Sequence, residues 1–505
     1  MSEYRYVLLV LFLLFKVGIY ATNGLWYGDF WEHSAVVSAL MANPVHPAHP
    51  LLALSAPHAF MSPYHWVLAA FANATGVGAI DALALFGLLN FCLLAIGLKF
   101  YVRGFAGRHT EFTSFYALLF ILFLWGANPW GHSGFFHFAQ LADVLPYSST
   151  FATALSFIAL GLGFSNTHRS TAWRALALTA MTTVVLLSHP LTFVFLASGL
   201  LCQCVQPGRP KFLIKAGGVL LVLCAAILVA MLWPYYSIVQ LLTGAGDIYH
   251  SSNLVMYVDV VGRIWPILVL SPLLLPAFTF ARTRSILLHI LFLVAVYFFG
   301  YVSGKYSYGR DITFIVILVQ ILMAHSVARA EAHLYQTQPV VAQVGRAVLA
   351  IALLAGARVW LVPTITRALT VVNSVVLGRQ VSNQQMYKNL TFLPQFVKPG
   401  EIVLSDLETS WLVPSFGGKV IAGLHAQAFI ADNDQRVEDL NGFFDPSASD
   451  QARLAVITRY GPTYLLLDKQ NTPEWKALAS RFEQEHHSRQ LFDNEQFLLI
   501  RLDGK

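Results

Sequence analysis

Charged residues are scarce in this sequence: Asp, Glu, Lys and Arg make up 11% of its 505 residues, whereas 56% are hydrophobic. A soluble domain could not hide so much apolar surface, so the composition predicts an integral membrane protein. The net charge of +6 does not indicate a nucleic-acid partner, because the basic residues lie in short loops between apolar runs.

Cysteine is also rare. The four cysteines (Cys92, Cys202, Cys204 and Cys224) lie in or beside apolar runs, and none lies in the polar C-terminal tail. This spacing excludes a disulfide framework and a zinc-finger pattern. The tail also lacks a P-loop and a GxGxxG sequence, which argues against a nucleotide site.

Long apolar runs predict about eleven membrane spans. The first, Tyr6–Tyr20, could instead be a signal peptide, but retaining it places the basic loops on one side of the membrane. The others are expected near residues 82–98, 113–126, 150–164, 175–188, 190–205, 216–233, 264–280, 286–303, 312–327 and 347–366.

Lysine and arginine are distributed unevenly between alternate loops. Nothing basic occurs between residues 17 and 98 or between 127 and 150. By the positive-inside rule, the basic loops are cytoplasmic, and so is the N-terminus. The C-terminal tail then lies outside, which in a bacterium is the periplasm beyond the inner membrane. The basic set comprises Lys99, Arg103, Arg108, Arg169, Arg174, Arg209, Lys211, Lys215, Arg282, Arg284, Arg329 and Arg346.

The first outer loop, about residues 22–80, is too long for a simple connection. Two amphipathic pieces, Glu32–Met41 and Tyr64–Ala72, suit helices lying along the membrane surface. The prolines between them forbid a long helix and favour an extended track. Residues 1–375 are therefore expected to form the membrane domain.

Residues 380–505 have ordinary charge density and read as a periplasmic α/β domain. We expect strands at Glu401–Leu404, Lys419–Ile421, Thr463–Leu467 and Phe497–Arg501, and helices at Ala448–Arg459 and Thr472–Glu485. The Trp411–Gly418 segment reads as a tight turn with a structural role, although Trp411 could stack on a sugar.

Polar groups gather on the outer face in two motifs. Gly28-Asp29-Phe30-Trp31-Glu32-His33 follows the first span, and a late turn reads GKYSYGRD, with Lys305, Tyr308 and Arg310. Ionisable groups are costly to hold near lipid, so such motifs are candidate functional sites. Taken alone, the first motif could simply begin the helix that follows it.

This organisation resembles the GT-C superfamily of polyprenyl-phosphate-sugar-dependent membrane glycosyltransferases. The resemblance covers the whole chain as architecture, but only GDFWEH and GRD as motifs. It is closest to the bacterial group of lipid A aminoarabinose transferases, arabinofuranosyltransferases and protein mannosyltransferases. The Asp29–Glu32 spacing departs from the adjacent acidic pair of several families.

The resemblance implies transfer of one sugar from a polyprenyl-phosphate donor to a glycan, lipid or protein acceptor, with inversion. Asp29 is the expected base that deprotonates the acceptor hydroxyl, and Glu32 would orient the acceptor or raise the pKa of Asp29. Arg310 would hold the leaving phosphate, with Lys305 and Arg263 as auxiliary charges. Alternatively, these three cations pair structurally with Asp311 or Asp259.

The histidines of the first loop have several possible roles. His33, His58 or His65 could bind phosphate or sugar hydroxyls, and Trp31, Tyr64 or Tyr308 could contact sugar or prenyl chain. No cofactor is required. A divalent cation stays open, because HPAHP places His46 and His49 three residues apart, although proline-flanked histidines more often pack or form hydrogen bonds.

Three other functions stay open. A transporter or flippase would need polar groups at mid-membrane and repeated halves, and the sequence contains no internal repeat. A glycan polymerase or ligase would be expected to carry arginines in a large late outer loop. A scaffold of envelope synthesis would use its C-terminal domain for binding and would not need Asp29.

Overall fold

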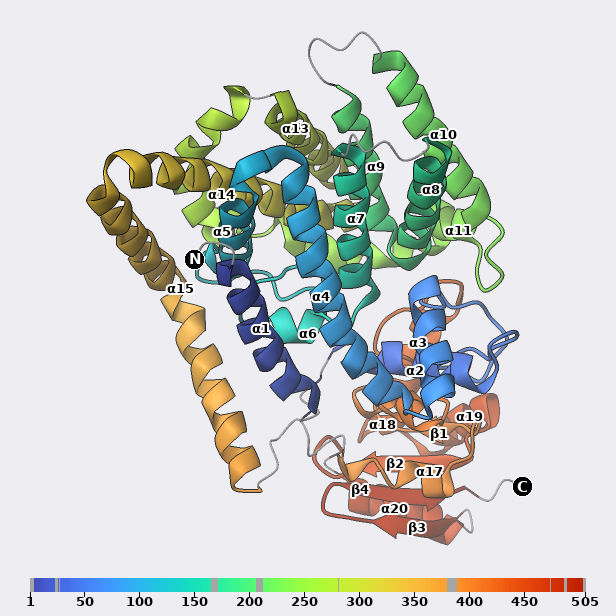
Figure 1. Cartoon of the computed structure of the whole chain (residues 1–505). Helices are drawn as coiled ribbons and strands as arrows, with labels where there is room; N and C mark the ends of the chain where they lie inside the picture. The colour runs from blue at the N-terminus through green and yellow to red at the C-terminus, as the bar shows by residue number, and fades with distance from the viewer. Residues whose placement is uncertain are drawn as a thin grey trace. The chain divides into compact units, whose positions relative to one another are not determined.

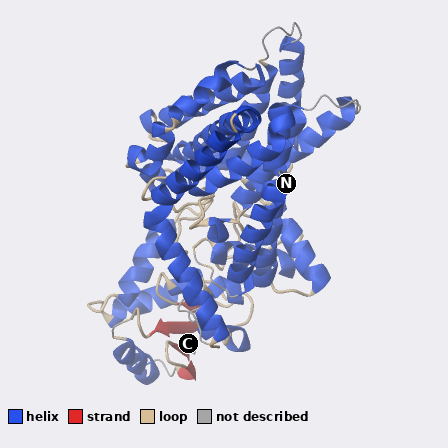
Figure 2. Cartoon of the chain, turned by 60° about the vertical axis from the view of Figure 1, so that its left-hand side comes forward, coloured by secondary structure: helices blue, strands red, loops and turns tan. Residues whose placement is uncertain are grey.

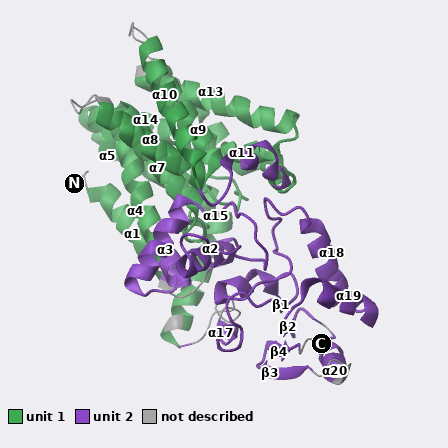
Figure 3. Ribbon diagram, turned by 90° about the vertical axis from the view of Figure 1, so that its right-hand side faces the viewer, with its two compact units in different colours: residues 1–20, 85–233, 249–377 green, residues 21–84, 234–248, 378–505 purple. Residues whose placement is uncertain are grey.

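The structure is a computed structural model. It describes residues 4–22, 26, 28–164, 171–205, 212–279, 281–378, 388–472, 474–485 and 488–502. Arg169, Arg209, Lys211 and the predicted domain start at residue 380 lie outside the described residues. The chain divides into two compact units, coloured separately in Figure 3. Unit 1 comprises residues 1–20, 85–233 and 249–377, and unit 2 comprises residues 21–84, 234–248 and 378–505.

Unit 1 is built from helices, as Figures 1 and 2 show. Its longest are α4, most of which belongs to this unit, and α15. Its α-helices are α1 (Tyr4–Thr22), α4 (Ala79–Ala106), α5 (Thr110–Phe123), α6 (Leu141–Val144), α7 (Ser148–Phe164), α8 (Thr171–Ser188), α9 (Pro190–Cys204), α10 (Phe212–Ala230), α12 (Val260–Val269), α13 (Ala281–Val302), α14 (Ile312–Thr337) and α15 (Pro339–Val376). Short 3₁₀ helices join them, including η1 (Gly107–His109), η4 (Ser251–Tyr257), η5 (Ser271–Thr279) and η6 (Tyr306–Asp311).

Seven helical stretches of the described chain are long and apolar enough to cross a membrane. They confirm a polytopic helical membrane protein. One of them, Ala79–Phe123, contains two predicted spans, because η1 connects α4 and α5 without a break. The helices Ser148–Phe164, Ala172–Ser188 and Pro190–Cys204 are apolar but shorter. The total of eleven spans stays a prediction.

The predicted span at 264–280 is wrong as a single helix. Helix α12 ends at Val269, and the 3₁₀ helix η5 follows from Ser271 to Thr279. Pro266, Pro272 and Pro276 remove backbone donors from this stretch, and proline interrupts the hydrogen-bond ladder of an α-helix. The apolar composition indicated a span, but proline sets the local backbone.

Unit 2 contains most of the first outer loop. Helices α2 (Phe30–Ala42) and α3 (Pro63–Thr75) contain the two predicted amphipathic pieces. Residues 43–62, between them, form no helix, as their prolines predict. The prediction assigned this loop to the membrane domain, whereas in the structure it groups with the C-terminal residues. The segment from residue 234 to 248 adds the short helix α11 (Ile238–Gln240) and the π-helix η2 (Leu241–Ala245).

The C-terminal part of unit 2 forms a four-stranded sheet in the order β1-β2-β4-β3. Strand β1 runs parallel to β2, and β2–β4 and β4–β3 are antiparallel. The strands are β1 (Val403–Leu404), β2 (Tyr464–Asp468), β3 (Arg489–Asp493) and β4 (Phe497–Arg501), and the helices are α17 (Leu393–Phe396), α18 (Asn433–Phe444), α19 (Asp450–Tyr460) and α20 (Trp475–Glu485).

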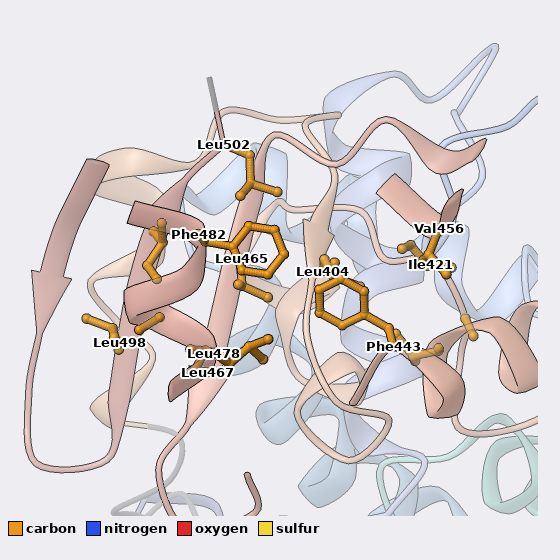
Figure 4. Close-up of a cluster of buried hydrophobic side chains, with 14 residues drawn as sticks. Leu404, Ile421, Phe443, Val456, Leu465, Leu467, Leu478, Phe482, Leu498 and Leu502 are labelled. Carbon is orange, nitrogen blue, oxygen red and sulfur yellow. The ribbon is translucent and has the colours of Figure 1, made fainter. Parts of the chain in front are cut away.

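Both central strands carry a buried apolar run, and their side chains pack with those of three helices. Figure 4 shows Leu465, Leu467 and Leu498 of the sheet among Phe443 of α18 and Phe482 of α20. Continuous apolar strands are expected where both faces are covered. The same cluster includes Val456 of α19.

Three predictions about this sheet need correction. Lys419–Ile421 is not a strand; Lys419 and Val420 make only isolated bridges, to Ile402 and Leu52. The edge strand β3 was missed, because its exposed polar residues give no apolar pattern. Helix α18 was missed for a similar reason, since NDQRVEDLNGFF buries only Leu440 and Phe443.

Candidate active site

The first candidate site lies in unit 2 at the start of helix α2. Gly28 has a φ of 75°, a backbone conformation that glycine adopts without strain. Asp29 follows at the N-cap position, and its carbonyl accepts the first intrahelical bond from the His33 amide at 3.0 Å. The partial positive charge at a helix N-terminus favours carboxylates there, so Asp29 and Glu32 suit this turn.

Asp29 is paired with a histidine from the C-terminal part of the same unit. The Oδ1 atom of Asp29 lies 3.4 Å from Nδ1 of His425, with 37% and 47% of the two side chains exposed. The ring of Trp411 meets His425 edge-on, with centroids 5.1 Å apart. Asp29 is therefore reachable from solvent and has a titratable partner at hydrogen-bonding range.

Glu32, one helical turn further on, is buried and held from two sides. Its Oε1 atom lies 3.3 Å from Nε2 of His58 and accepts a hydrogen bond from the Gln427 amide at 3.2 Å. Burial by itself raises the pKa of a carboxyl group, but the interaction with His58 and the nearby His425 and His33 outweigh it. The pKa of Glu32 consequently lies below its usual value.

A second histidine pair lies beside this turn. Nδ1 of His33 is 2.7 Å from Nε2 of His65, whose Nδ1 is 2.9 Å from the Ser62 hydroxyl. The ring of Phe60 stacks on His33 at a centroid distance of 4.7 Å. Burial lowers the pKa of His33 to about 4 and that of His65 well below its usual value. Both rings are therefore neutral at pH 7.

The tautomers of His49 and His58 follow from their backbone contacts. Nδ1 of His49 accepts hydrogen bonds from the amides of Leu51 and Leu52, and Nδ1 of His58 accepts one from Phe60. The proton of each neutral ring must therefore be on Nε2. In His58 this places an N–H opposite Glu32. Burial lowers the pKa of His49 to about 2.

The predicted aromatic contacts are enclosed by the protein. Trp31 is 4% exposed and Tyr64 only 1%. The carbonyl of Trp31 accepts hydrogen bonds from the hydroxyls of Ser34 and Ser415, both at 2.9 Å. The predicted turn at Trp411–Gly418 thus packs on α2 through Ser415. Direct stacking of Trp31 or Tyr64 on a sugar stays a prediction.

The second candidate site lies in unit 1, at 3₁₀ helix η6. Arg310 donates from Nε to Oδ1 of Asn253 at 2.6 Å and from Nη1 to the Ser133 hydroxyl at 3.0 Å. These bonds fix the guanidinium between three segments of the unit. The neighbouring Asp311 is buried, and its carboxylate oxygens have no hydrogen-bond partner within the described part of the chain.

The other predicted phosphate ligands differ in their surroundings. Lys305 is exposed at the start of η6, and Tyr308 is half-buried with its ring against Phe299. Arg263 donates to the carbonyls of Val258 and Asn128 and lies over the Trp130 ring. Among the described residues, no ion pair joins any of the three predicted cations to Asp259 or Asp311. The alternative structural pairing is therefore not found.

Comparison with solved structures identifies the architecture. The apo structure of ArnT from Cupriavidus metallidurans, an aminoarabinose transferase, superposes with a TM-score of 0.55 at 14% identity, covering 99% of this chain and 98% of that chain. ArnT is a GT-C superfamily member. The chain has a GT-C fold. This confirms the resemblance drawn from GDFWEH, GRD and the arrangement of spans.

Other GT-C structures agree. The oligosaccharyltransferase of Archaeoglobus fulgidus, crystallised with zinc and sulfate, matches with a TM-score of 0.51 at 13% identity, covering 89% of this chain and 65% of that chain. The same enzyme tethered to an acceptor peptide matches with a TM-score of 0.50 at 12% identity, covering 94% and 70%. No protein-family model and no curated protein sequence matches this chain.

A metal site was one reading of the first-loop histidines. Within the described ranges, no three His, Cys, Asp or Glu side chains are grouped so that they could hold a metal ion. Nδ1 of His49 and of His58 accept backbone amides, and His46 is exposed. These residues do not fit a metal centre, and we derive no step through one.

Sequence reasoning missed the C-terminal residues that complete the Asp29 site. His425 and Gln427 lie in a loop after Lys419–Ile421, and Asn433 fixes that loop through Oδ1 and Nδ2 bonds to the Gln427 backbone. Lys419 donates to the carbonyls of His49 and Pro50. The signal available was the polar GLHAQ stretch of the tail, but its pairing with the first loop is a long-range contact.

Proposed function

We propose that the protein is a GT-C glycosyltransferase of a bacterial inner membrane. It moves a single sugar from a polyprenyl-phosphate donor to a periplasmic glycan, lipid or protein acceptor. The N-terminus is cytoplasmic and residues 380–505 are periplasmic in this proposal. The observation that carries it is the half-exposed carboxylate of Asp29, held beside His425 at the start of α2.

Asp29 has the features of a general base. Its carboxylate is accessible, and the polar first turn of α2 is fixed by the bond between Glu32 and Gln427 and by the contact of Glu32 with His58. Asp29 would take the proton of the acceptor hydroxyl as the oxygen attacks the anomeric carbon. The glycosidic bond to phosphate breaks, and the prenyl phosphate leaves with the electron pair. Attack opposite the leaving group inverts the anomeric centre.

Arg310 has the features of a phosphate ligand. Two side-chain bonds, to Asn253 and Ser133, hold its guanidinium in one orientation. A guanidinium has five N–H donors and can bind protein and phosphate oxygens at the same time. The charge that develops on the leaving phosphate would be stabilised by such a preorganised cation. Lys305, which is exposed, is the auxiliary charge, and the bonds of Arg263 to backbone carbonyls favour a supporting role.

Glu32, His33, His58 and His65 form the packed wall of this proposed site. Their contacts with one another support a positioning role for the α2 turn. Direct contact of these residues, or of Tyr308, with donor or acceptor belongs to the proposal. The two GT-C neighbours, ArnT and an oligosaccharyltransferase, are transferases by name, and this supports the same general chemistry here.

The experiment is a turnover assay with the purified full-length protein. Wild type and Asp29→Asn are incubated with a panel of synthetic prenyl-phosphate sugars, and release of prenyl phosphate is followed. We expect release by the wild type and a loss of about 10²-fold or more in the Asp29→Asn enzyme, since a general base contributes about 10²–10⁴-fold. An Asp29→Asn protein with full activity would overturn the assignment of the base. Absence of turnover and of binding for every donor would overturn the transferase.

A further inference from the structure

A second recess in unit 1 is unrelated to the proposed transferase chemistry. It encloses about 390 Å³ and lies where the C-terminal end of α4, η1, the start of α13 and the second half of α14 meet. Its lining includes Arg108, His109, Arg282, His325 and Arg329. Three guanidinium groups and two imidazoles therefore surround one cavity.

The lining carries charge of one sign only. None of the residues that line the recess is Asp or Glu. Bringing three permanent cations to one hollow is unfavourable unless an anion is present, because like charges repel more strongly where protein displaces water. A concave surface lined with one sign of charge also concentrates the field on its interior. The lining thus calls for an anionic ligand.

Contacts within the unit hold these side chains in place. Arg282 donates from Nη1 to the Gly104 carbonyl at 2.8 Å, and Arg108 donates from Nε to His109 at 3.3 Å. The ring of His325 lies 3.2 Å from the Thr113 hydroxyl and meets Phe105 edge-on. Each bond uses one donor, and a guanidinium has five. Arg282 and Arg108 keep donors suited to a planar or tetrahedral oxyanion.

The recess lies far along α14 from Arg310. Helix α14 begins at Ile312, directly after η6, and reaches Arg329 after 17 further residues. At 1.5 Å per residue this is roughly 25 Å, comparable to the hydrocarbon thickness of about 30 Å. The two arginine sites therefore face opposite membrane surfaces. Arg108, Arg282 and Arg329 belong to the loops that the positive-inside rule assigns to the cytoplasm.

The positive-inside rule alone does not explain the recess, because it requires basic loops but no cavity. Arg103 and Arg284 belong to the same loops and do not line the recess. A volume of about 390 Å³ holds about a dozen waters at about 30 Å³ each. A bare phosphate would leave most of that space empty. A phosphate ester with a small polar substituent, such as glycerol phosphate, fits better.

We propose that this recess, on the predicted cytoplasmic face, binds a phosphate ester through Arg108, Arg282 and Arg329. Two sources share that chemistry: the headgroup of an anionic phospholipid of the inner leaflet, and a soluble sugar or glycerol phosphate. Basic pockets between membrane helices on the cytoplasmic side are known to take anionic headgroups. The inference is independent of the proposed transferase activity.

The test uses two charge-matched double variants of the full-length protein. Arg108→Gln/Arg282→Gln removes two lining cations, whereas Arg103→Gln/Arg284→Gln removes two cations from the same loops outside the recess. Retention of phosphatidylglycerol against phosphatidylcholine is measured by native mass spectrometry. In detergent, glycerol phosphate and inorganic phosphate are titrated by calorimetry. We expect about tenfold weaker binding in the lining variant and little change in the matched variant.

The two arms separate the sources. Preference for phosphatidylglycerol with no binding of the soluble esters assigns the recess to a lipid headgroup, and saturable binding of glycerol phosphate assigns it to a soluble ester. Either result supports a phosphate-ester site if it depends on Arg108 and Arg282. Equal weakening in both double variants would reduce the effect to diffuse surface charge and overturn the proposal, as would binding of neither probe.

Discussion

The carboxylate of Asp29 lies 3.4 Å from Nδ1 of His425, although the two residues come from opposite ends of the chain. The first belongs to the turn that starts α2, and the second to a loop fixed by Asn433. Both side chains are half-exposed. This pairing gives the proposed base a partner that can orient it and pass its proton to solvent.

Replacing His425 should therefore slow turnover without weakening substrate binding. We expect His425→Gln to lower kcat about tenfold with little change in KM, since orientation of a general base acts on the transition state. Because the ring is half-exposed, added imidazole should restore part of the activity of His425→Ala. A fully active His425→Gln enzyme, with Asp29→Asn inactive, would remove His425 from the mechanism and leave the base intact.

Arg310 should act mainly through the donor phosphate. We expect Arg310→Gln to lower kcat/KM for the prenyl-phosphate donor about 100-fold, because a charge-assisted bidentate contact is lost. Arg310→Lys keeps the charge but cannot reproduce the Nε bond to Asn253, so an intermediate loss is expected. Steady-state kinetics with varied donor measure this. Unchanged kcat/KM in Arg310→Gln would contradict the assignment.

Asn253 offers a matched test of that arrangement. Asn253→Ala removes the acceptor of the Arg310 Nε bond without touching a charge, and about a tenfold loss in kcat/KM is expected, since one hydrogen bond to a charged group is worth about 1.5–3 kcal/mol. Combined with Arg310→Gln, it should add little further loss, because the two act as one unit. Full additivity would separate them.

Lys419 should stabilise the proline-rich segment of the first loop. Its ammonium donates to the carbonyls of His49 and Pro50 at 2.6 and 2.9 Å. Lys419→Met leaves both buried carbonyls without this donor, and we expect a loss of about 2–4 kcal/mol in stability. Limited proteolysis of residues 43–62 should become faster. Lys398→Met, at an exposed lysine, is the control, and equal cleavage of both variants would contradict the role.

Acid should destabilise unit 2 partly through His49. Burial lowers the pKa of His49 to about 2 in the folded state, whereas an unfolded histidine titrates near 6.5. Below pH 6.5 the unfolded chain therefore binds a proton that the folded chain does not. Stability is lost as pH falls from about 6.5, by about 1.4 kcal/mol per pH unit for this group.

His49→Asn tests this expectation, because its side-chain oxygen can still accept the amides of Leu51 and Leu52. Thermal unfolding at pH 7, 6 and 5 should show a smaller acid-induced fall in midpoint for the variant than for wild type. His46→Asn, at an exposed histidine, serves as the comparison. The same pH slope in wild type and His49→Asn would mean that His49 titrates alike in both states.

The membrane class, the two helices of the first outer loop and strand β4 could be predicted from sequence because each rests on local pattern. Apolar runs give spans, and Phe497–Arg501 is a short apolar run whose predicted bounds are those of β4. The break at Pro266, Pro272 and Pro276 was missed because hydropathy averages over residues, whereas proline acts on individual hydrogen bonds.

The sequence by itself determined which residues are chemically unusual: a carboxylate pair after the first span and an arginine in the GRD turn. Only the tertiary structure decided their partners. His425 meets Asp29, Gln427 meets Glu32, and Asn253 holds Arg310. It also decided that Arg108, Arg282 and Arg329 share one recess. Composition and periodicity report on neighbours along the chain, whereas these contacts join residues that only the packed fold brings together.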